Sequence, residues 1–274
     1  MNKTIVITGA SSGIGKATAK HFNAKGWNVV ATMRSPEKEQ DLKESATLKL
    51  VALDVQSVDS IKKAVDASIA HFGTIDVWLN NAGYGAHGPL EAGTREQIQR
   101  QFDVNYFGLI DCIKGILPHF RQKRSGTIIN VSSVGGLMVL PLYSAYNSSK
   151  FAVEGLTEGL FYELEPLGIK VKLIEPGGIK TEFLGRSEET WGIENLPDYK
   201  PFVDQIHAKF FSPEMAKNFG TPEMVAEVIY KAATDGTKTL RYLAGKDAKQ
   251  FWFIRRWFGY KAQMAGLKSF LGLK

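Results

Sequence analysis

Short apolar runs alternate with longer amphipathic stretches through most of this 274-residue chain. Runs such as Leu48–Leu53 are typical of buried strands, whereas the spacing of apolar residues in Val58–Phe72 is typical of a helix. Parallel strands need long crossover connections, which are usually helices. The alternation therefore predicts an α/β fold built on a single doubly wound parallel sheet, with helices on both of its faces.

The same patterns set approximate bounds for each element. The expected strands are Lys3–Thr8, Trp27–Thr32, Leu48–Leu53, Ile75–Leu79, Gly126–Val131, Lys170–Ile174 and Leu240–Ala244. The expected helices are Gly13–Lys25, Val58–Phe72, Glu96–Leu117, Tyr143–Leu164 and Pro222–Thr234, the last with Thr221 as N-cap. No repeat or Pro/Ser-rich linker divides the chain, so we expect one domain over residues 1–274. Residues 183–220, rich in aromatic side chains, are expected to form a substrate flap.

Composition excludes several classes of protein. No stretch approaches the roughly 20 apolar residues of a membrane-spanning helix, and the few before Thr8 are too short for a signal peptide. The one cysteine, Cys112, rules out an internal disulfide and suits a reducing compartment, so we expect a cytoplasmic location. The five histidines show no metal-ligand spacing, and we expect no metal site. A net charge of +6 is small for a nucleic-acid binder, and we expect no nucleic-acid partner.

The segment Thr8–Gly15, with the sequence TGASSGIG, joins the first expected strand to the first expected helix. Such a glycine turn presents free backbone N–H groups and the positive end of a helix dipole, both of which favour phosphate. In open α/β sheets, dinucleotides bind at this edge. The spacing differs from G-x-G-x-x-G, and many βα turns use glycine for tight packing. On its own, the turn leaves nucleotide binding open.

The end of the second strand indicates which dinucleotide is preferred. An acid that could accept hydrogen bonds from the adenosine ribose is missing there, and Arg34 follows the strand instead. A guanidinium matches the 2′-phosphate of NADP(H), and Ser11 or Ser12 could add a hydroxyl donor. The alternative is an ordinary solvated loop arginine. We expect NADP(H) to be preferred, with NAD(H) possible.

Further motifs follow in order along the chain. They are Asn80-Asn81-Ala82-Gly83, Ser132-Ser133, Tyr146-Asn147-Ser148-Ser149-Lys150 and Pro176-Gly177-Gly178-Ile179-Lys180-Thr181, with Asp54 and Asn105 as isolated matches. Together with the glycine turn, they make the chain from Lys3 to about Thr181 resemble the short-chain dehydrogenase/reductase family. The resemblance implies a Rossmann-type fold and an oxidoreductase that interconverts an alcohol and a carbonyl.

The residues themselves carry part of this chemistry. Tyr146 and Lys150 lie four positions apart on an expected helix, so their side chains are neighbours. An ammonium near a phenol favours the phenolate, so Lys150 together with the positive nicotinamide ring is expected to lower the pKa of Tyr146. Tyr146 would donate a proton to a carbonyl oxygen in reduction and remove one from the alcohol in oxidation. Ser133 would hydrogen-bond the same oxygen, with Ser132 as a rival for that role; Tyr143 has no lysine four residues later.

Other roles come from the resemblance alone. It implies that Lys150 also holds the nicotinamide ribose and that Asn105 helps to bind a water that relays protons. The expected catalytic residues are Tyr146, Lys150, Ser133 and Asn105. The expected cofactor contacts are Gly9, Ser11, Ser12, Gly13, Ile14, Gly15, Arg34, Asp54, Val55, Asn81, Ala82, Gly83, Tyr146, Lys150, Pro176, Gly177, Ile179 and Thr181.

Two features bear on the substrate. Ser133–Met138, the flap and the extension after Gly245 resemble the family branch that contains 17β-hydroxysteroid and retinol dehydrogenases, which implies an apolar steroid-, retinoid- or lipid-like substrate. Two alternatives are a non-enzymatic NADP(H)-binding sensor and a nucleotide-sugar epimerase or dehydratase. The intact Ser, Tyr and Lys set favours an enzyme over the sensor.

The extension over residues 246–274 holds seven basic residues, one acid and seven aromatic residues. A basic helix with aromatic side chains can lie on an anionic membrane surface. A terminal helix can equally pack over its own active site or against a second subunit. We expect a helical extension and a homo-oligomer. The sequence does not decide whether the extension lies on a membrane, over the active site or against a second subunit.

Overall fold

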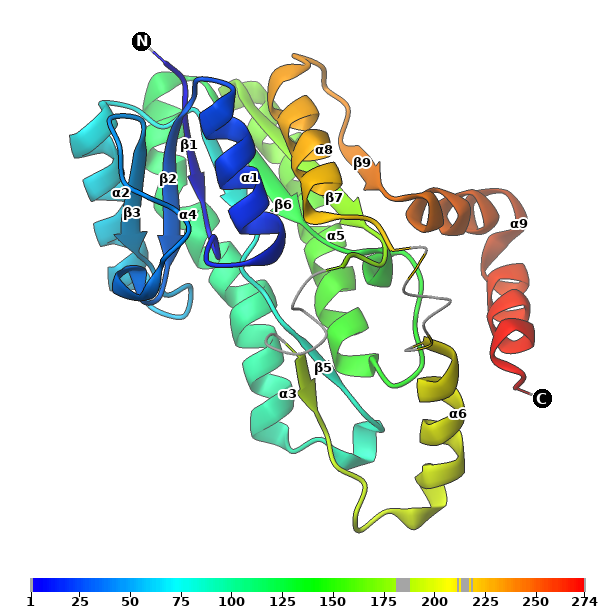
Figure 1. Ribbon diagram of the computed structural model, residues 1–274. Coiled ribbons are helices and arrows are strands. Elements are labelled where there is room, and N and C mark those ends of the chain that lie inside the picture. The colour runs from blue at the N-terminus through cyan, green and yellow to red at the C-terminus, as the bar shows by residue number, and fades with distance from the viewer. Residues whose placement is uncertain (1, 181–187, 211, 213–216, 218, 274) are drawn as a thin grey trace.

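The computed structural model describes residues 2–180, 188–210, 212, 217 and 219–273. Within them, seven strands form one parallel sheet in the order β3-β2-β1-β4-β6-β7-β9 (Figure 1). These strands are β1 (Thr4–Ile7), β2 (Asn28–Met33), β3 (Leu48–Ala52), β4 (Val77–Asn80), β6 (Gly126–Val131), β7 (Ile169–Pro176) and β9 (Arg241–Ala244). A separate parallel pair joins β5 (Gly85–His87) to β8 (Glu188–Thr190). The predicted doubly wound parallel sheet is confirmed.

Helices cover both faces of the sheet, as the alternation of elements predicts. The α-helices of the described residues are α1 (Gly13–Ala24), α2 (Val58–Phe72), α3 (Arg95–Phe102), α4 (Gly108–Lys123), α5 (Ser144–Leu164), α6 (Lys200–Phe210), α8 (Pro222–Thr234) and α9 (Lys246–Leu271). Helices α1 and α8 pack on one face of the sheet, and α2, α4 and α5 pack on the other (Figure 1).

Strand β1 shows why its sequence has no polar face. Ile5 and Ile7 pack among the side chains of α1 and α8, whereas Val6 packs on the opposite face among those of α2, α4 and α5. All three side chains are fully buried. A strand covered on both faces has a continuous apolar sequence rather than an alternating one. This burial fixes the end of β1, and with it the position of the glycine turn that follows.

The helix expected over Glu96–Leu117 differs from the prediction. It consists of α3 and α4 joined by a π-helical turn over Asp103–Phe107, and α4 continues through Pro118. Proline removes a backbone donor, which normally ends a helix. Here Phe120, beyond the proline, is fully buried against the sheet, and this burial offsets the lost hydrogen bond.

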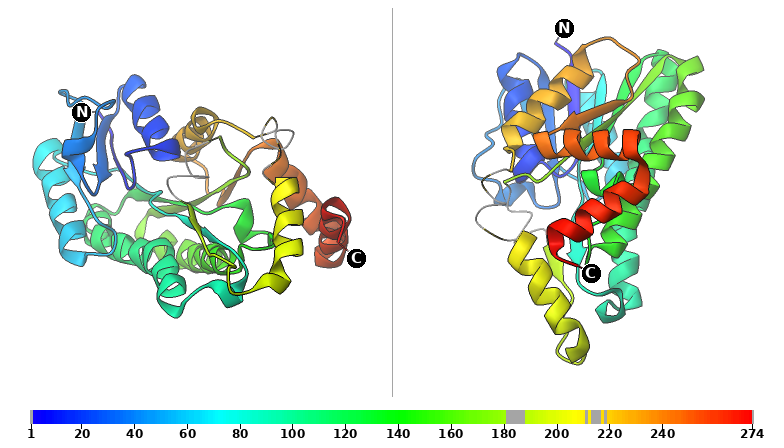
Figure 2. Two further views of the ribbon diagram at one scale, coloured as in Figure 1. Left: turned by 60° about the horizontal axis from the view of Figure 1, so that its bottom comes forward. Right: turned by 90° about the vertical axis from the view of Figure 1, so that its right-hand side faces the viewer.

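The segment around residues 183–220 has its own small cores. Trp191 packs with Ala86 and Ala145 beside the β5–β8 pair, while Val203 and Ile206 of α6 pack with Leu271 at the end of α9. Figure 2 shows α6 and α9 side by side at the edge of the molecule. Periodicity did not predict β5 and β8, which are three residues each.

Helix α9 confirms the predicted helical extension, with one bend. Gly259 has a φ of 74°, so two straight segments meet at that residue. The start of the preceding helix is also as predicted, because the Thr221 hydroxyl accepts a hydrogen bond from the Met224 N–H. Among the described residues, no helix is long and apolar enough to cross a membrane.

Candidate active site

A cavity of about 730 Å³ opens along the carboxyl ends of the parallel strands. This is the edge where open α/β sheets bind dinucleotides, next to the point between β1 and β4 at which the strand order reverses. Most of the predicted site residues line it. They are Gly9, Ser11, Ser12, Gly13, Ile14, Arg34, Asp54, Val55, Asn81, Ala82, Gly83, Ser133, Tyr146, Lys150, Pro176, Gly177 and Ile179.

The remaining predicted residues lie elsewhere. Gly15 is buried beneath the turn rather than at the cavity surface, and Asn105 is buried behind the cavity wall. Thr181 lies outside the residues that the structure describes. No metal-binding group of three or more His, Cys, Asp or Glu side chains occurs among the described residues.

The glycine turn is shaped by two close approaches of backbone. Gly9 has a φ of 68°, and a Cβ built on it would lie 2.8 Å from the Cα of Ala82. A Cβ on Gly15 would lie 2.3 Å from the carbonyl oxygen of Gly9. Only glycine fits both positions. The turn therefore brings the N-terminus of α1 against the end of β4, and the N–H groups of this terminus are a site that suits phosphate.

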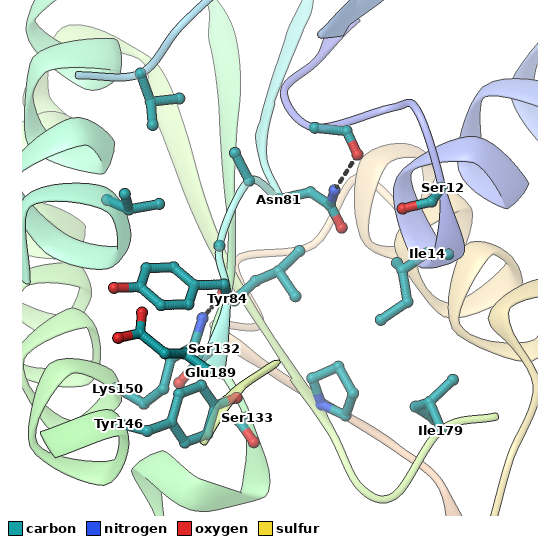
Figure 3. A pocket seen from close by; sticks show the side chains of 18 of the residues that line it. Ser12, Ile14, Asn81, Tyr84, Ser132, Ser133, Tyr146, Lys150, Ile179 and Glu189 are labelled. Atoms are coloured by element: carbon teal, nitrogen blue, oxygen red, sulfur yellow. Dashed lines mark hydrogen bonds between the residues drawn. The ribbon is translucent and has the colours of Figure 1, made fainter. Parts of the chain in front are cut away.

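Asn81 holds this arrangement together. Its Nδ2 donates to the carbonyl oxygens of Thr8 at 2.9 Å and Gly9 at 3.1 Å, and the Thr8 hydroxyl accepts from the N–H groups of Asn81 and Ala82. Asn81 lies at the cavity wall across from Ser12, as Figure 3 shows. The amide nitrogen of Asn81 is thus used to fix the turn, which leaves its carbonyl oxygen at the cavity. Asn80, by contrast, is buried in a hydrogen-bond chain with Trp78 and Asn130.

The far end of the cavity carries a cation. Arg34 directly follows β2, its side chain is exposed at the cavity, and it has no carboxylate partner within the described parts of the chain. Ser11 lies on the same wall. Asp54 also lines this end, but its carboxylate accepts from the Gln56 N–H at 3.0 Å and shapes a turn after β3. An unpaired guanidinium beside a glycine turn suits an anionic group such as a phosphate.

Tyr146, Ser133 and Lys150 meet at the opposite end of the cavity (Figure 3). Tyr146 and Lys150 come from successive turns of α5, and Ser133 comes from the turn after β6. The Ser133 and Tyr146 hydroxyls share a hydrogen bond. The Lys150 ammonium donates to the carbonyl oxygen of Val131 at 3.1 Å and lies 5.8 Å from the centre of the Tyr146 ring. The structure thus brings together three of the four expected catalytic side chains at one end of the cavity.

The pKa of Tyr146 differs from the prediction. Burial raises it to about 12, and the hydrogen bond from Ser133 opposes that rise. Lys150 was expected to lower this pKa, but its ammonium points toward the backbone of β6, and burial lowers its own pKa to about 8. Removal of water from a buried phenol therefore outweighs the neighbouring cation, because desolvation penalises the charged forms of both groups.

The structure also separates Ser133 from its rival Ser132. Ser133 hydrogen-bonds Tyr146 at the cavity, whereas Ser132, which also lines the cavity, is almost fully buried, with its hydroxyl and the Glu154 carboxylate both next to Gly136. Glu154 belongs to a buried cluster in which the Arg241 guanidinium contacts the carboxylates of Glu154 and Glu175. Burial and the neighbouring Glu154 carboxylate together raise the pKa of Glu175 to about 8.

Asn105 occupies the π-helical turn between α3 and α4. Its Oδ1 accepts from the Tyr84 N–H at 3.0 Å, and its Nδ2 donates to the Tyr84 carbonyl at 2.9 Å and the Ser149 hydroxyl at 3.2 Å. A Cβ on Gly83 would lie 3.1 Å from Asn105 Oδ1 and 3.8 Å from Lys150 Nζ. Asn105 therefore fixes the backbone beside Lys150, and a role in proton relay stays a prediction.

Comparison with known proteins identifies the family. A family model described as short chain dehydrogenase matches residues 3–191, about two thirds of the chain. The protein belongs to the short-chain dehydrogenase/reductase family. It is thus an oxidoreductase that acts on CH–OH groups with NAD(P).

Three relatives of this short-chain dehydrogenase illustrate the range of the family. Retinol dehydrogenase 8 of Bos taurus is 36% identical over 252 residues, which cover 87% of this chain and 80% of the relative. The 3-ketodihydrosphingosine reductase of Bacteroides thetaiotaomicron is 42% identical over 179 residues, 65% of each protein. The structure of ElxO with NADP bound is 28% identical, with a TM-score of 0.75, and the match covers 91% of this chain and all of that one.

The short-chain dehydrogenase also has cavity residues that the motifs did not predict. Tyr84, Arg100 and Glu189 line the cavity as well, and Figure 3 shows Tyr84 and Glu189 on the side of Lys150. Arg100 pairs with Glu189 at 3.0 Å, and its guanidinium lies 5.3 Å from the centre of the Tyr84 ring. Tyr84 lies in the loop after β4, Arg100 in α3 and Glu189 in β8. Predicting that they meet would have required knowledge of the β5–β8 pairing, which the periodicity of the sequence does not show.

The segment expected to form a substrate flap divides its described aromatic rings between the cavity and the small cores. Among its described aromatic residues, Phe210 and Phe219 line the cavity, whereas Trp191, Tyr199 and Phe202 pack in the small cores. Phe211 lies outside the described residues. Aromatic content alone could not separate rings that cover a cavity from rings that fill a core.

Proposed function

We propose that the protein is an NADP(H)-dependent oxidoreductase that interconverts a carbonyl and a secondary or primary alcohol on an apolar substrate, with Tyr146 as acid and base. One observation carries this proposal. A single cavity begins at the glycine turn of β1 and α1 and ends at the Tyr146, Ser133 and Lys150 side chains. A site for a phosphate-bearing cofactor and a proton donor therefore lie along the same cavity.

The residues present fit a nicotinamide dinucleotide. The close backbone approaches at Gly9 and Gly15 leave the N-terminus of α1 free for a pyrophosphate, and Arg34 suits the 2′-phosphate of NADP(H). Pro176, Gly177 and Ile179 would hold the nicotinamide end. ElxO, a structural relative, was solved with NADP bound, which supports this choice over NAD(H). When bound, the cofactor supplies or accepts the hydride.

The side chains at the Tyr146 end of the cavity would transfer the proton and stabilise the charge on the substrate oxygen. In reduction, the Tyr146 hydroxyl donates its proton to the substrate oxygen, and in oxidation the phenolate takes it back. Ser133, already hydrogen-bonded to Tyr146, donates to the same oxygen and stabilises the charge that develops there. The Val131 carbonyl holds the Lys150 ammonium 5.8 Å from the centre of the Tyr146 ring. A raised tyrosine pKa keeps the proton available for donation across neutral pH.

The walls near Tyr146 support an apolar substrate. Val134, Leu140, Tyr143, Phe210 and Phe219 line this part of the cavity. The names of two relatives, a retinol dehydrogenase and a 3-ketodihydrosphingosine reductase, refer to compounds with long apolar chains. We therefore extend the proposal to steroid-, retinoid- or lipid-like carbonyls, in which the Tyr84, Arg100 and Glu189 cluster would contact a polar group of the substrate.

The test is a comparison of Tyr146→Phe with Tyr143→Phe, assayed by NADPH absorbance on a panel of retinoid, steroid and long-chain ketones. Both tyrosines line the cavity, but only Tyr146 shares a hydrogen bond with Ser133. We expect Tyr146→Phe to lose turnover by roughly 10²- to 10⁴-fold. Its NADPH affinity, measured by fluorescence, should match that of the wild type. Equal turnover by wild type and Tyr146→Phe would overturn the mechanism, and small polar ketones as the sole substrates would overturn the substrate class.

A further inference from the structure

The first segment of α9, before Gly259, has an outer face made of aromatic rings and cations. Phe253, Trp257 and Phe258 are 55%, 68% and 64% exposed, and the centre of the Phe253 ring lies 6.5 Å from that of Trp257 and 6.1 Å from that of Phe258. Phe253 and Trp257 lie on one helical face together with the exposed cations Lys246, Lys249 and Arg256, since these positions recur at helical spacing.

The opposite face of α9 is attached to the rest of the protein. Ala248 is fully buried, and Trp252 lies beneath the guanidinium of Arg241 at 5.3 Å. The Arg255 guanidinium lies 5.9 Å from the centre of the Phe151 ring on α5 and donates to Gln263 in the second segment. The helix, which Figure 2 shows lying along the side of the molecule, is thus docked by one face. Its exposed rings therefore belong to a fixed surface.

The second segment of α9 continues the same composition. Tyr260 and Met264 are 59% and 49% exposed and lie one helical turn apart, with the exposed cations Lys261 and Lys268 nearby in the sequence. From residue 246 to residue 271 the helix has six basic residues and one acid, Asp247. That acid points inward, because its carboxylate accepts a hydrogen bond from the Gly178 N–H at 2.7 Å.

We propose that the outer face of α9 binds the surface of an anionic lipid bilayer. The rings provide apolar area, and Trp and Tyr favour the boundary between headgroups and acyl chains. The cations complement anionic headgroups, and no exposed acid of α9 opposes them. The helix lies on the bilayer rather than through it, since none of the described helices is apolar enough to span one.

A second copy of the chain fits this face less well. Contact between two copies through the same face would bring their Lys246, Lys249 and Arg256 cations together. Like charges at an interface oppose association unless acids separate them, and this face has none. Charge therefore favours an anionic partner, and the Trp, Tyr and Phe rings beside the cations favour a lipid surface.

The test is flotation with vesicles made of phosphatidylcholine alone or with about a third phosphatidylserine. We expect the wild-type protein to float with the anionic vesicles, and to lose most of this binding in high salt because exposed charges are screened. The variant Phe253→Ser/Trp257→Ser/Phe258→Ser should bind at least tenfold more weakly. The variant Lys249→Glu/Arg256→Glu should show a similar loss.

A matched control is Tyr162→Ser, which removes a 74% exposed ring from α5 instead. This variant should bind vesicles as the wild type does. Thermal unfolding and turnover of a water-soluble substrate should be unchanged in all variants, because none of these side chains lines the cavity. The proposal would be overturned if the wild-type protein did not float with anionic vesicles. It would also be overturned if the triple variant bound these vesicles as strongly as the wild type does. A triple variant that lowers only the mass in solution would assign the face to a second copy.

Discussion

Ser133 and Tyr146 share a hydrogen bond between their hydroxyl groups, although one follows β6 and the other lies in the first turn of α5. The two residues are neighbours because the turn after β6 packs against α5, where the Gly135 backbone lies beside the Tyr146 ring. A carbonyl oxygen placed between the hydroxyls would accept from both. The proposed function therefore predicts that the substrate oxygen binds between these two hydroxyls.

Replacement of Ser133 should consequently cost far more activity than replacement of Ser132. We expect Ser133→Ala to lower kcat by roughly 10²- to 10³-fold, the effect of removing one donor to a developing oxyanion. Ser132→Ala, which removes a buried hydroxyl that shares no hydrogen bond with Tyr146, should keep kcat within about tenfold. Steady-state kinetics on one substrate check both variants. The reverse order would assign the oxyanion role to Ser132.

The free enzyme should hold Tyr146 protonated at neutral pH, because burial raises its pKa to about 12. An ultraviolet difference titration of wild type against Tyr146→Phe should then show no phenolate from this residue below about pH 10. In the proposed mechanism alcohol oxidation uses the Tyr146 phenolate, so its rate should increase as the pH rises from 6 to 9. A Tyr146 phenolate that forms near pH 7 in the free protein would show that the Lys150 ammonium lowers the pKa of Tyr146 by more than burial raises it.

Arg34→Asp should weaken NADPH binding by roughly tenfold to a hundredfold, the range for losing charge-assisted hydrogen bonds to a phosphate. NADH lacks that phosphate, so its affinity should change little. Fluorescence titration of both cofactors measures the difference. Equal losses for NADPH and NADH would mean that Arg34 does not contact the 2′-phosphate.

The buried cluster of Glu154, Glu175 and Arg241 should make stability depend on pH. Burial and the Glu154 carboxylate raise the pKa of Glu175 to about 8, so the folded state holds a proton that the unfolded state has released above about pH 4.5. This contribution is complete below pH 4.5 and is lost as the pH rises through 8.

The thermal unfolding midpoint of the wild type should accordingly fall between pH 5.5 and pH 8.5 relative to that of Glu175→Gln, whose amide does not titrate. Glu227→Gln on α8 removes an exposed carboxylate and is the control, with a pH dependence like that of the wild type. Parallel curves for wild type and Glu175→Gln would contradict the shifted pKa.

Features that depend on local pattern could be predicted from the sequence. The seven strands of the main sheet and the bounds of α2 and β6 follow from apolar periodicity, because each element buries a face that its own sequence specifies. Tyr146 and Lys150 follow from helical spacing, and Thr221 follows from capping chemistry.

Features that depend on tertiary contacts could not be predicted in this way. The β5–β8 pair joins two segments of three residues about 100 positions apart, too short for any periodicity. It places Glu189 beside Arg100 at the cavity, a contact that neither segment shows alone. The pKa of Tyr146 is a second case, because burial, which the sequence does not state, outweighs the nearby lysine.

The one cysteine of the chain, Cys112, is fully buried in α4, and burial raises the pKa of its thiol far above the usual range. A protonated, inaccessible thiol does not react with alkylating reagents. The wild-type protein therefore needs no removal of its native cysteine before thiol labelling. A cysteine introduced on the outer face of α9 would accept a spin label or fluorophore at that site alone, which allows depth in a bilayer to be measured directly.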